Sequence, residues 1–371
     1  MIWVSNLRTS DTMTSVKIRF VPVWHFTPLL LLCATGLACQ SEQNASGTNT
    51  LQKLQIEGPT MGTSYHITVC SDAVDSPDKS KIQQDVDLLL KTINQQMSTY
   101  IKTSELSKFN QSTAEEWFPV SAPLVKVVDS GLKLSEDSDG AFDMTVGPLV
   151  NLWHFGPDPG KRTIPEESQI EAARKSVGYH HIQVQHDTPA LKKTIPEVYL
   201  DLSAIAKGYA VDAVGEYLES QSVQNYLVEI GGEMRARGSN QQGEPWNVGI
   251  EKPVSEKRVV QHVFPLDNLS MATSGNYRNF FEVDGVSYSH TIDPRTGRPV
   301  KHALASVTVV GEKCMNCDAI ATCLMVLGAE EGYNWCAERD IAAYFIVKAE
   351  TGFRERYSPQ WQHLFGEVNE K

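Results

Sequence analysis

The chain alternates between two patterns of apolar and polar positions. In some stretches apolar residues recur every three or four positions, which predicts amphipathic helices, and in others they alternate with polar residues, which predicts strands. The clearest helical pattern covers 81–97. Further helices are expected after Ser104 and Ser121 as N-caps, and over 165–176, 204–220, 318–327 and 330–338.

The predicted strands are short and follow one another without a regular β–α–β repeat. They cover 54–69 with breaks at Gly58-Pro59 and Gly62, then 181–186, 197–202, 226–230, 234–238, 246–250, 259–265, 269–273, 305–310 and 342–347. Asp284-Gly285 predicts a tight hairpin between 280–283 and 286–288. We therefore expect an α+β fold, with a mixed, mainly antiparallel sheet flanked by helices.

The N-terminal segment has a different composition. Lys17 and Arg19 precede an apolar run over 20–38 that two prolines interrupt. The run is too short for a membrane-spanning helix, so residues 1–39 are predicted to be a secretory signal peptide.

The run ends with a small residue before Cys39, as in a bacterial lipoprotein cleavage site. We expect Cys39 to be lipidated, which would attach the protein to a bacterial membrane, the outer one, on its periplasmic side. A plain signal peptide is the alternative. Polar residues 40–52 then form a flexible tether, and 53–371 form a single domain.

Charge and cysteine content exclude some classes of function. The net charge is −12 and no basic cluster is present, so we expect no nucleic-acid partner. The five cysteines beyond the leader are an odd number for full pairing. Cys314-Met-Asn-Cys317 could be a redox pair, a disulfide, part of a zinc site or neither, and no second motif with zinc spacing follows.

A predicted strand-to-helix junction at 200–213 is the first candidate for a binding site. The start of a helix offers unpaired N–H groups and a positive dipole end, which suit phosphate. Asp201 and Lys207 flank this junction with one charge of each sign. The alternative is an ordinary turn with a solvated lysine.

Two further positions could carry chemistry. Asp318 and Thr322 are four residues apart and therefore share one helical face, where their oxygens would suit Mg²⁺. A helix-capping aspartate with a back-bonded threonine is the alternative. His290 is predicted on a strand before a Pro/Gly turn and could act as a general base, or be a half-buried structural histidine.

Several motifs occur together in an order that resembles the ApbE family of FAD:protein FMN transferases. They are Thr60-Met-Gly-Thr63, Met97-Ser-Thr-Tyr100, residues 140–153 from Gly-Ala-Phe-Asp to Asn-Leu-Trp, Asp201-Leu-Ser-Ala-Ile-Ala-Lys-Gly-Tyr-Ala-Val-Asp212, Gly231-Gly-Glu, Ser274-Gly-Asn-Tyr-Arg278, His290-Thr-Ile-Asp-Pro-Arg-Thr-Gly-Arg-Pro299 and Asp318-Ala-Ile-Ala-Thr322. Together they span about 58–328.

The resemblance implies an enzyme that uses Mg²⁺ and takes FAD as substrate. It would move FMN onto a threonine hydroxyl of an acceptor protein and release AMP. The acceptors implied are subunits of membrane redox complexes, such as the sodium-pumping quinone reductase and Rnf, which carry a Ser/Thr-Gly-Ala-Thr-type motif.

The resemblance also implies roles for individual residues. His290 would be the catalytic base. The side chains of Asp318 and Thr322 and the carbonyls of Ala204 and Ala321 would hold Mg²⁺. The FAD contacts would be Met61, Ser98, Thr99, Tyr100, Ala141, Phe142, Asp143, Asp201, Lys207 and Ile292.

Three other functions compete with this one. The same site could hydrolyse FAD as a pyrophosphatase, with water in place of threonine. The protein could instead be a periplasmic FAD-binding lipoprotein without enzymatic activity. A thiol–disulfide protein that uses Cys314 and Cys317 is the third, although the usual thioredoxin-like context is missing.

Overall fold

A computed structural model describes residues 51–72, 78–113, 115–157, 160–254, 259–277 and 280–366. The predicted signal peptide, Cys39 and all but the last two residues of the predicted tether lie outside these ranges. Gln52, the last tether residue, is already paired with Ser71 in a strand. No helix in the described ranges has the length and hydropathy needed to span a membrane.

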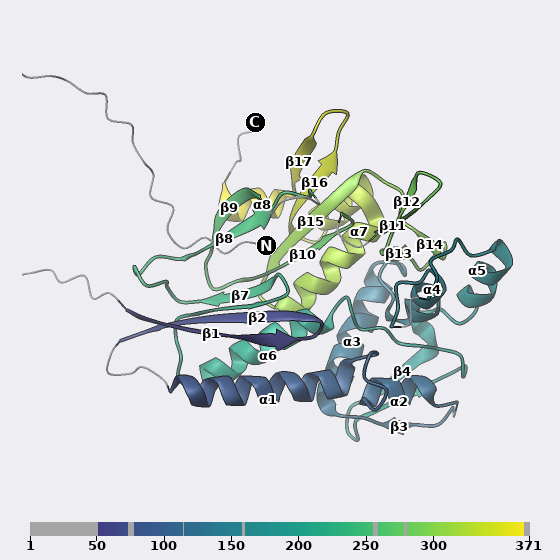
Figure 1. Cartoon of the computed structure of the whole chain (residues 1–371), viewed down its shortest axis with the longest axis horizontal. Helices are drawn as coiled ribbons and strands as arrows, with labels where there is room; N and C mark the ends of the chain where they lie inside the picture. Colours follow the sequence, from purple (N-terminus) through teal and green to yellow (C-terminus); the bar gives the residue numbers. More distant parts are fainter. Residues whose placement is uncertain are drawn as a thin grey trace, which may run out of the picture.

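Within the described residues, one eight-stranded sheet forms the centre of the molecule, with the order β1-β2-β6-β7-β10-β15-β16-β17 (Figure 1). All of its neighbouring strands are antiparallel. The strands are β1 (Gln52–Thr60), β2 (Thr63–Ser71), β6 (Tyr226–Ile230), β7 (Glu233–Arg237), β10 (Ser270–Gly275), β15 (Leu304–Gly311), β16 (Ala342–Lys348) and β17 (Phe353–Tyr357). The predicted α+β class with a mainly antiparallel sheet is confirmed.

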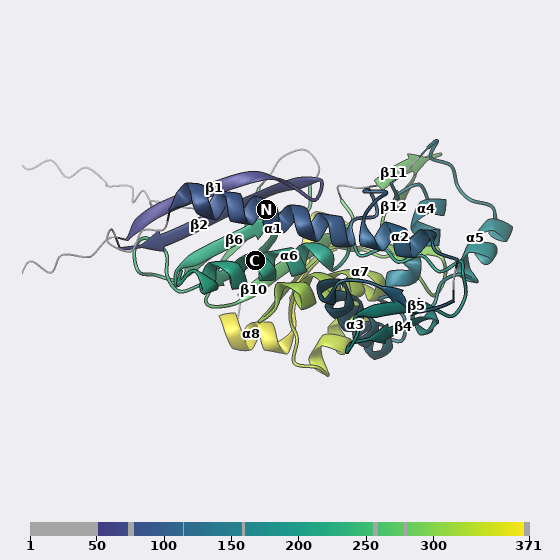
Figure 2. The same ribbon diagram turned by 90° about the horizontal axis from the view of Figure 1, so that it is seen from below.

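Helices cover one face of this sheet. They are α1 (Lys79–Met97), which runs along β1 and β2, with α6 (Ala206–Ser220) against β6 and β7, and α7 (Cys314–Ala337) against β10 and β15 (Figure 2). The apolar side chains of α1 that sequence periodicity selects, such as Val86 and Leu90, are buried in the core beneath them. Burial of this stripe stabilises the helix more than its intrinsic propensity does.

The opposite face is covered by a hairpin and a short helix. The hairpin is β8 (Trp246–Glu251) with β9 (Val260–Leu266), and the helix is α8 (Pro359–Phe365). Trp246, Phe264 and Trp361 are buried in a second core there. Tyr226, Val228 and Ile230 of β6 point into the first core, whereas Leu227, Met234 and Ala236 of β6 and β7 point into the second, so both faces of the sheet are closed over β6.

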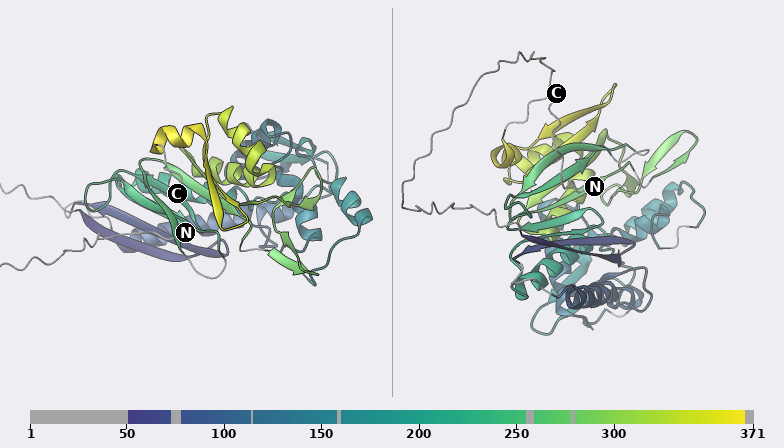
Figure 3. Two further views of the ribbon diagram at one scale, coloured as in Figure 1. Left: turned by 90° about the horizontal axis from the view of Figure 1, so that it is seen from above. Right: turned by 60° about the vertical axis from the view of Figure 1, so that its left-hand side comes forward.

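The remaining elements gather at one end of the sheet. They are α2 (Glu105–Gln111), α3 (Ala122–Asp137), α4 (Gly147–Leu152), α5 (Glu167–Arg174), the 3₁₀ turns Met144–Val146 and Tyr179–His181, and the three-stranded sheet of β3 (Phe118–Pro119), β5 (Ala190–Lys193) and β4 (Ile182–Gln185). The hairpin of β11 (Phe280–Val283) and β12 (Val286–Ser289) projects from this end (Figure 3). Its Phe281 and Tyr288 stack on each other, and Tyr288 also stacks on Trp153.

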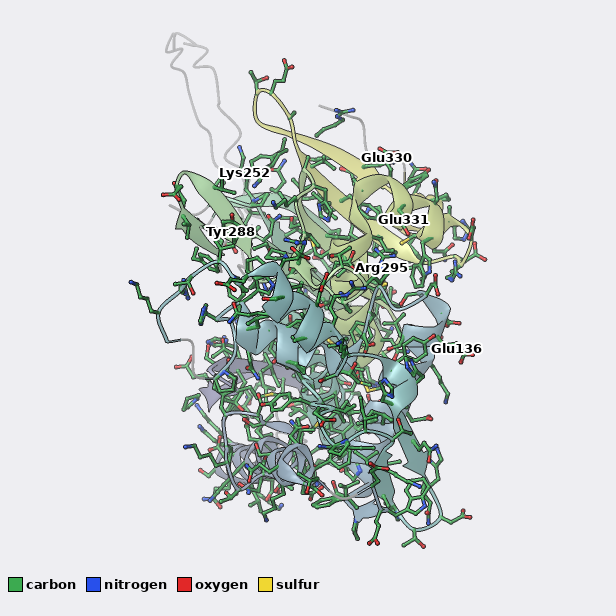
Figure 4. The ribbon with its side chains drawn as sticks, turned by 90° about the vertical axis from the view of Figure 1, so that its right-hand side faces the viewer. Glu136, Lys252, Tyr288, Arg295, Glu330 and Glu331 are labelled. Atoms are coloured by element: carbon green, nitrogen blue, oxygen red, sulfur yellow. The ribbon has the colours of Figure 1, made fainter. Side chains whose placement is uncertain are left out.

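The motif at 290–299 forms a second small hairpin against α7. Its strands are β13 (Ile292–Asp293) and β14 (Arg298–Pro299). Arg295 pairs with Asp293 and reaches toward Glu331, with 3.8 Å between the Arg295 and Glu331 side chains (Figure 4). Glu331 lies beyond a break in α7 at Gly328, whose φ of 81° lies in the left-handed region.

Several sequence-based assignments need correction. Residues 197–202 form no strand, and α6 starts at Ala206 with Ile205 as its N-cap in place of the predicted Ser203. The helix predicted from 318 begins at Cys314, and the break at Gly328 separates it from the second predicted helix as expected. His290 lies in a bend between β12 and β13, not on a strand. Ser121 is the N-cap of α3, but its side chain makes no capping bond.

Candidate functional site

A cavity of about 460 Å³ opens where α6 and α7 meet the ends of β7 and β10. The segment 141–146 and the bend after β12 complete its wall. Most of the residues predicted to act lie in this wall, although they come from five separate motifs. They are Tyr100, Ala141, Phe142, Asp143, Asp201, Ala204, Lys207, His290, Ile292, Asp318 and Thr322.

The close crossing of α6 and α7 builds the end of the cavity that is rich in oxygen atoms. Gly208 allows the crossing, because a methyl group there would overlap the Cys314 carbonyl oxygen and lie 2.8 Å from Asp318 Cβ. The Gly208 N–H donates to Asp318 Oδ2 over 2.9 Å. The buried Asp318 carboxylate, 3% exposed, is thereby fixed with Oδ1 as its second oxygen.

That same bond changes the hydrogen bonding at the start of α6. In a continuous helix the Gly208 N–H would donate to the carbonyl of Ala204, four residues earlier. It donates to Asp318 instead, which releases the Ala204 carbonyl from this helical bond. Ala204 lies in the cavity wall, so the sequence arranges a backbone oxygen close to the aspartate.

Thr322 lies one turn beyond Asp318 on α7. Its Oγ1 is 3.2 Å from the hydroxyl of Ser274, the fifth residue of β10. Both residues line the cavity, so this wall presents hydroxyl oxygens next to the carboxylate.

These donors fit Mg²⁺. A carboxylate, a threonine hydroxyl and a backbone carbonyl are all hard oxygen ligands, and Mg²⁺ commonly takes few protein ligands and completes its shell with water and phosphate oxygens. No group of three or more His, Cys, Asp and Glu side chains in the described ranges could hold a metal. A magnesium site here would therefore depend on hydroxyl and carbonyl oxygens beside a single aspartate.

Lys207 supplies positive charge at the same place. Its Nζ is 3.1 Å from Glu233 Oε1 and 3.6 Å from Asp318 Oδ1. Burial alone lowers the pKa of Lys207, but Asp318 and Glu233 more than reverse this and raise it above its ordinary value. Burial raises the pKa of Glu233, and Lys207 opposes that rise. Lys207 therefore remains an ammonium ion next to the oxygen donors.

His290 lines the same cavity from the bend between β12 and β13, next to Thr291 and Ile292. Its ring centroid is 6.2 Å from that of Phe155, in an edge-to-face arrangement. The imidazole is half-buried and borders the cavity, which is the position that a general base acting on an incoming hydroxyl would need.

The wall near Asp143 is apolar and rigid. Asp143 Oδ1 accepts hydrogen bonds from the N–H and hydroxyl of Thr145, and Oδ2 accepts from the N–H of Tyr179. Burial raises the pKa of Asp143, while these bonds oppose the rise. Since both oxygens bind the protein itself, Asp143 shapes the loop that carries Ala141 and Phe142.

Tyr100 and Asp201 border the cavity at its exposed side. Tyr100 is 66% exposed, so its ring could lie against a planar ligand. Asp201 Oδ1 accepts from the N–H and hydroxyl of Ser203, which fixes the turn before α6.

Four predicted residues do not line the cavity. Met61 lies in the turn between β1 and β2 with a positive φ of 48°. The carbonyl of Ser98 accepts from Ser104 and Ser107 at the end of α1, with Thr99 next to it. Ala321 is fully buried in α7, where only its backbone could reach a ligand. Their assigned roles stay predictions.

Sequence reasoning did not assign a role to other wall residues. Glu233 and Ser274 lie within motifs that carry the resemblance, but neither was predicted to act. Glu233 follows two glycines directly after a buried strand, a place where a strand end could deliver a carboxylate to a cavity. Tyr277, in the same motif as Ser274, also lines the wall, as do Phe155 and Thr273, which lie in none of the motifs.

The Cys314–Cys317 motif lies behind this site, in the first turn of α7. Both thiols are free and buried, and they donate to the carbonyls of Met271 and Ser270. Burial raises the pKa of Cys314. A buried thiol with a raised pKa is a poor nucleophile, which argues against a thiol–disulfide function.

By fold, the protein is of the α+β class, with a central antiparallel sheet and a cavity built at the crossing of two helices. The chain belongs to the ApbE family, whose family model matches residues 61–345. The resemblance on which the sequence analysis relied is therefore confirmed.

Named relatives agree with this assignment. An FAD:protein FMN transferase of Vibrio cholerae serotype O1 is 46% identical over 311 residues, which cover 84% of this chain and 92% of the relative. The structure of flavin transferase ApbE from Vibrio cholerae matches with a TM-score of 0.78 at 44% identity, covering 84% of this chain and 99% of that one. The apo flavinyl transferase ApbE of Pseudomonas stutzeri matches with a TM-score of 0.79 at 39% identity, covering 86% and 98%.

Proposed function

We propose that this protein is a Mg²⁺-dependent FAD:protein FMN transferase that flavinylates a threonine of an acceptor protein and releases AMP. The printed names of the relatives support the transferase. Support for the chemistry comes from one observation, namely that Lys207, Asp318, Thr322 and His290 share one cavity wall.

Phosphoryl transfer needs positioning and charge neutralisation more than covalent chemistry. Mg²⁺ bound by Asp318, Thr322 and the Ala204 carbonyl would neutralise the diphosphate of FAD and make AMP a better leaving group. Lys207 and the N-terminus of α6 add positive potential for the same phosphates.

His290 takes the proton of the acceptor threonine. The hydroxyl oxygen then forms a bond to the phosphorus of the FMN half, the bond from that phosphorus to the bridging oxygen breaks, and AMP leaves with the bridging oxygen. General base catalysis of this kind contributes roughly 10²–10⁴-fold. Phe142, Ile292 and the other apolar residues of the wall restrict the access of water, which would compete with the threonine.

The function is tested by incubating the protein with FAD, Mg²⁺ and an acceptor subunit that carries a Ser/Thr-Gly-Ala-Thr-type motif. Covalent flavin on the acceptor is detected by gel fluorescence and confirmed by its mass. His290→Ala should still bind FAD, measured by quenching of flavin fluorescence, but should transfer at least roughly 100-fold more slowly. Full turnover of this variant would remove the role of His290.

The same assay separates the rival functions. AMP release without a flavinylated acceptor would identify a pyrophosphatase. Tight FAD binding with neither product would identify a flavin-binding protein without enzymatic activity. Removal of Mg²⁺ with a chelator should stop transfer, and transfer that continues without divalent cations would refute the metal requirement.

The proposal also covers the cellular location of the enzyme and the class of protein that it modifies. With a lipid on Cys39, the enzyme would work on the periplasmic side of the outer membrane and serve subunits of redox complexes such as the sodium-pumping quinone reductase or Rnf. Labelling with palmitate in a bacterial host should mark the wild-type chain but not Cys39→Ala. A labelled variant would contradict the anchor.

A further inference from the structure

Glu233 is a third charged side chain at the crossing of α6 and α7, and none of the roles above uses it. It is the first residue of β7 and is only 4% exposed. Its Oε1 contacts Lys207 Nζ at 3.1 Å. Its Oε2 has no hydrogen-bond partner among the described residues.

Lys207 therefore lies between two buried carboxylates and is nearer to Glu233. The distance to Asp318 Oδ1 is 3.6 Å, compared with 3.1 Å to Glu233 Oε1. The other oxygen of Asp318, Oδ2, already accepts from the Gly208 N–H. Oδ1 is thus the Asp318 oxygen left for a cation, and it is also the one that the ammonium of Lys207 approaches.

Without Glu233 the balance of attractions would change. A partly buried ammonium such as that of Lys207, 27% exposed, moves toward the nearest uncompensated carboxylate, because an unpaired charge away from water is costly. Lys207 would then pair fully with Asp318 Oδ1 and occupy the space of a divalent cation.

We propose that Glu233 is a positioning residue that holds Lys207 away from Asp318 Oδ1 and so keeps this oxygen available to the divalent cation. Glu233 acts through Lys207 and is not itself a metal ligand. The inference rests on the Mg²⁺ site of the proposed function, but it does not require that FMN be transferred.

Metal binding by the purified protein tests this without any turnover. Mn²⁺ replaces Mg²⁺, and the loss of the free Mn²⁺ signal in electron paramagnetic resonance gives the dissociation constant with and without FAD. Glu233→Gln, which keeps the shape but removes the charge, should weaken Mn²⁺ binding at least roughly tenfold, about 1.4 kcal/mol. Glu233→Asp keeps the charge and should retain most of the affinity.

A double-mutant cycle with Lys207→Met shows whether Glu233 affects Mn²⁺ affinity through Lys207. If Glu233 acts through Lys207, Glu233→Gln should have little further effect in the Lys207→Met background. A loss that persists in full there would mean that Glu233 contacts the cation directly, and would overturn the proposal. Wild-type affinity in the Glu233→Gln single variant would overturn it as well.

Glu229→Gln is the matched control. Glu229 lies four residues earlier, in β6 just before the same glycine pair, but its carboxylate pairs with His66 and accepts from the Gly232 N–H, and it does not line the cavity. Its loss should leave Mn²⁺ binding unchanged. Circular dichroism and urea unfolding check that each variant is folded.

Failures of the two proposals are distinguishable. If the wild type binds Mn²⁺ and the cycle behaves as described but no acceptor is flavinylated, the transferase assignment falls and this inference stands. If flavinylation occurs but the cycle shows no coupling, only the inference falls. Absence of Mn²⁺ binding by the wild type, with or without FAD, would overturn the metal site and the inference together.

Discussion

Thr322 is the residue in which sequence and geometry agree most closely. Its spacing from Asp318 predicted a shared helical face, and both side chains line one cavity, with the Thr322 hydroxyl 3.2 Å from Ser274 Oγ. An i, i+4 pair needs only a helix to be brought together, so the sequence could predict it. Glu233 could not be predicted, because its relation to Lys207 depends on how β7 and α6 pack.

Removal of the Thr322 hydroxyl should affect the cation and not the fold. Thr322→Val keeps the shape of the side chain, so we expect Mg²⁺ or Mn²⁺ affinity to fall at least roughly tenfold, about 1.4 kcal/mol. Titration of the metal into the purified variant measures this. Thr308→Val is the control. Thr308 lies in the neighbouring strand β15, and its hydroxyl pairs with that of Thr273 over 2.8 Å, so the variant removes a similar hydroxyl pair. Equal losses in both variants would contradict a role of Thr322 as a ligand.

At the scale of elements, the helices were predicted better than the strands. Residues 197–202 illustrate the reason. Val198, Leu200 and Leu202 are buried in alternation, as the sequence suggested, but the partner of Leu200 is a side chain and not a neighbouring strand. The Asn110 amide both donates to the Leu200 carbonyl and accepts from its N–H, each over 2.8 Å. A side-chain amide that replaces a neighbouring strand leaves no trace in the local pattern.

The start of α7 was missed for a related reason. Lys313, its N-cap residue, makes no side-chain capping bond. Asp212 on α6 caps the helix instead, since Oδ1 accepts from the N–H of Cys314 and Oδ2 from that of Met315. Arg235 holds the same carboxylate at 3.1 Å. A cap supplied from another helix cannot be recognised from the sequence around the helix it caps.

Asp212 should therefore control the position of Asp318 as well as stability. Asp212→Asn replaces one acceptor oxygen with a donor, so we expect a loss of about 1–3 kcal/mol in the free energy of unfolding and weaker metal binding. Urea unfolding and a metal titration measure the two effects.

The control for Asp212 is Glu219→Gln. Glu219 pairs with the same Arg235, and its other partners, Arg237 and Tyr226, also lie on the sheet. Its loss should cost some stability and leave metal affinity unchanged. If Asp212→Asn binds metal as tightly as the wild type, the capping bonds do not position the site.

At the scale of the whole molecule, the class of fold was predictable because antiparallel sheets have short strands and tight turns that are visible locally. The order of the strands was not. β10 pairs with β7 and β15, and β15 pairs with β16 across the whole of α7. Pairings over such distances are decided by packing, which no local pattern records.

The buried thiols predict how stability depends on pH. Burial raises the pKa of Cys323 and of Cys336 to about 12 each. In the unfolded chain both thiols would ionise from about pH 8.5. Above that pH the native state binds more protons than the unfolded state, so stability falls as pH rises, by about 1.4 kcal/mol per pH unit for each thiol.

The measurement is urea unfolding of the wild type and Cys336→Ala between pH 7 and 9.5. The variant should lose stability more slowly above pH 8.5, whatever its stability at pH 7. Lys193 acts in the opposite sense, because burial lowers its pKa to about 8, but it is present in both proteins. Parallel curves for the two proteins would contradict the assignment.

The bond between the Gly208 N–H and Asp318 joins residues that are 110 positions apart. A ribosome or a secretion channel delivers these two partners at very different times. While only the first three hundred or so residues have emerged, the nascent chain has Lys207 but not Asp318, so the Gly208 N–H can still donate to the Ala204 carbonyl as in an ordinary helix. The bond that frees the Ala204 carbonyl therefore forms only after most of the chain has been made, and a chain terminated before Asp318 would lack the oxygen donors of the proposed metal site.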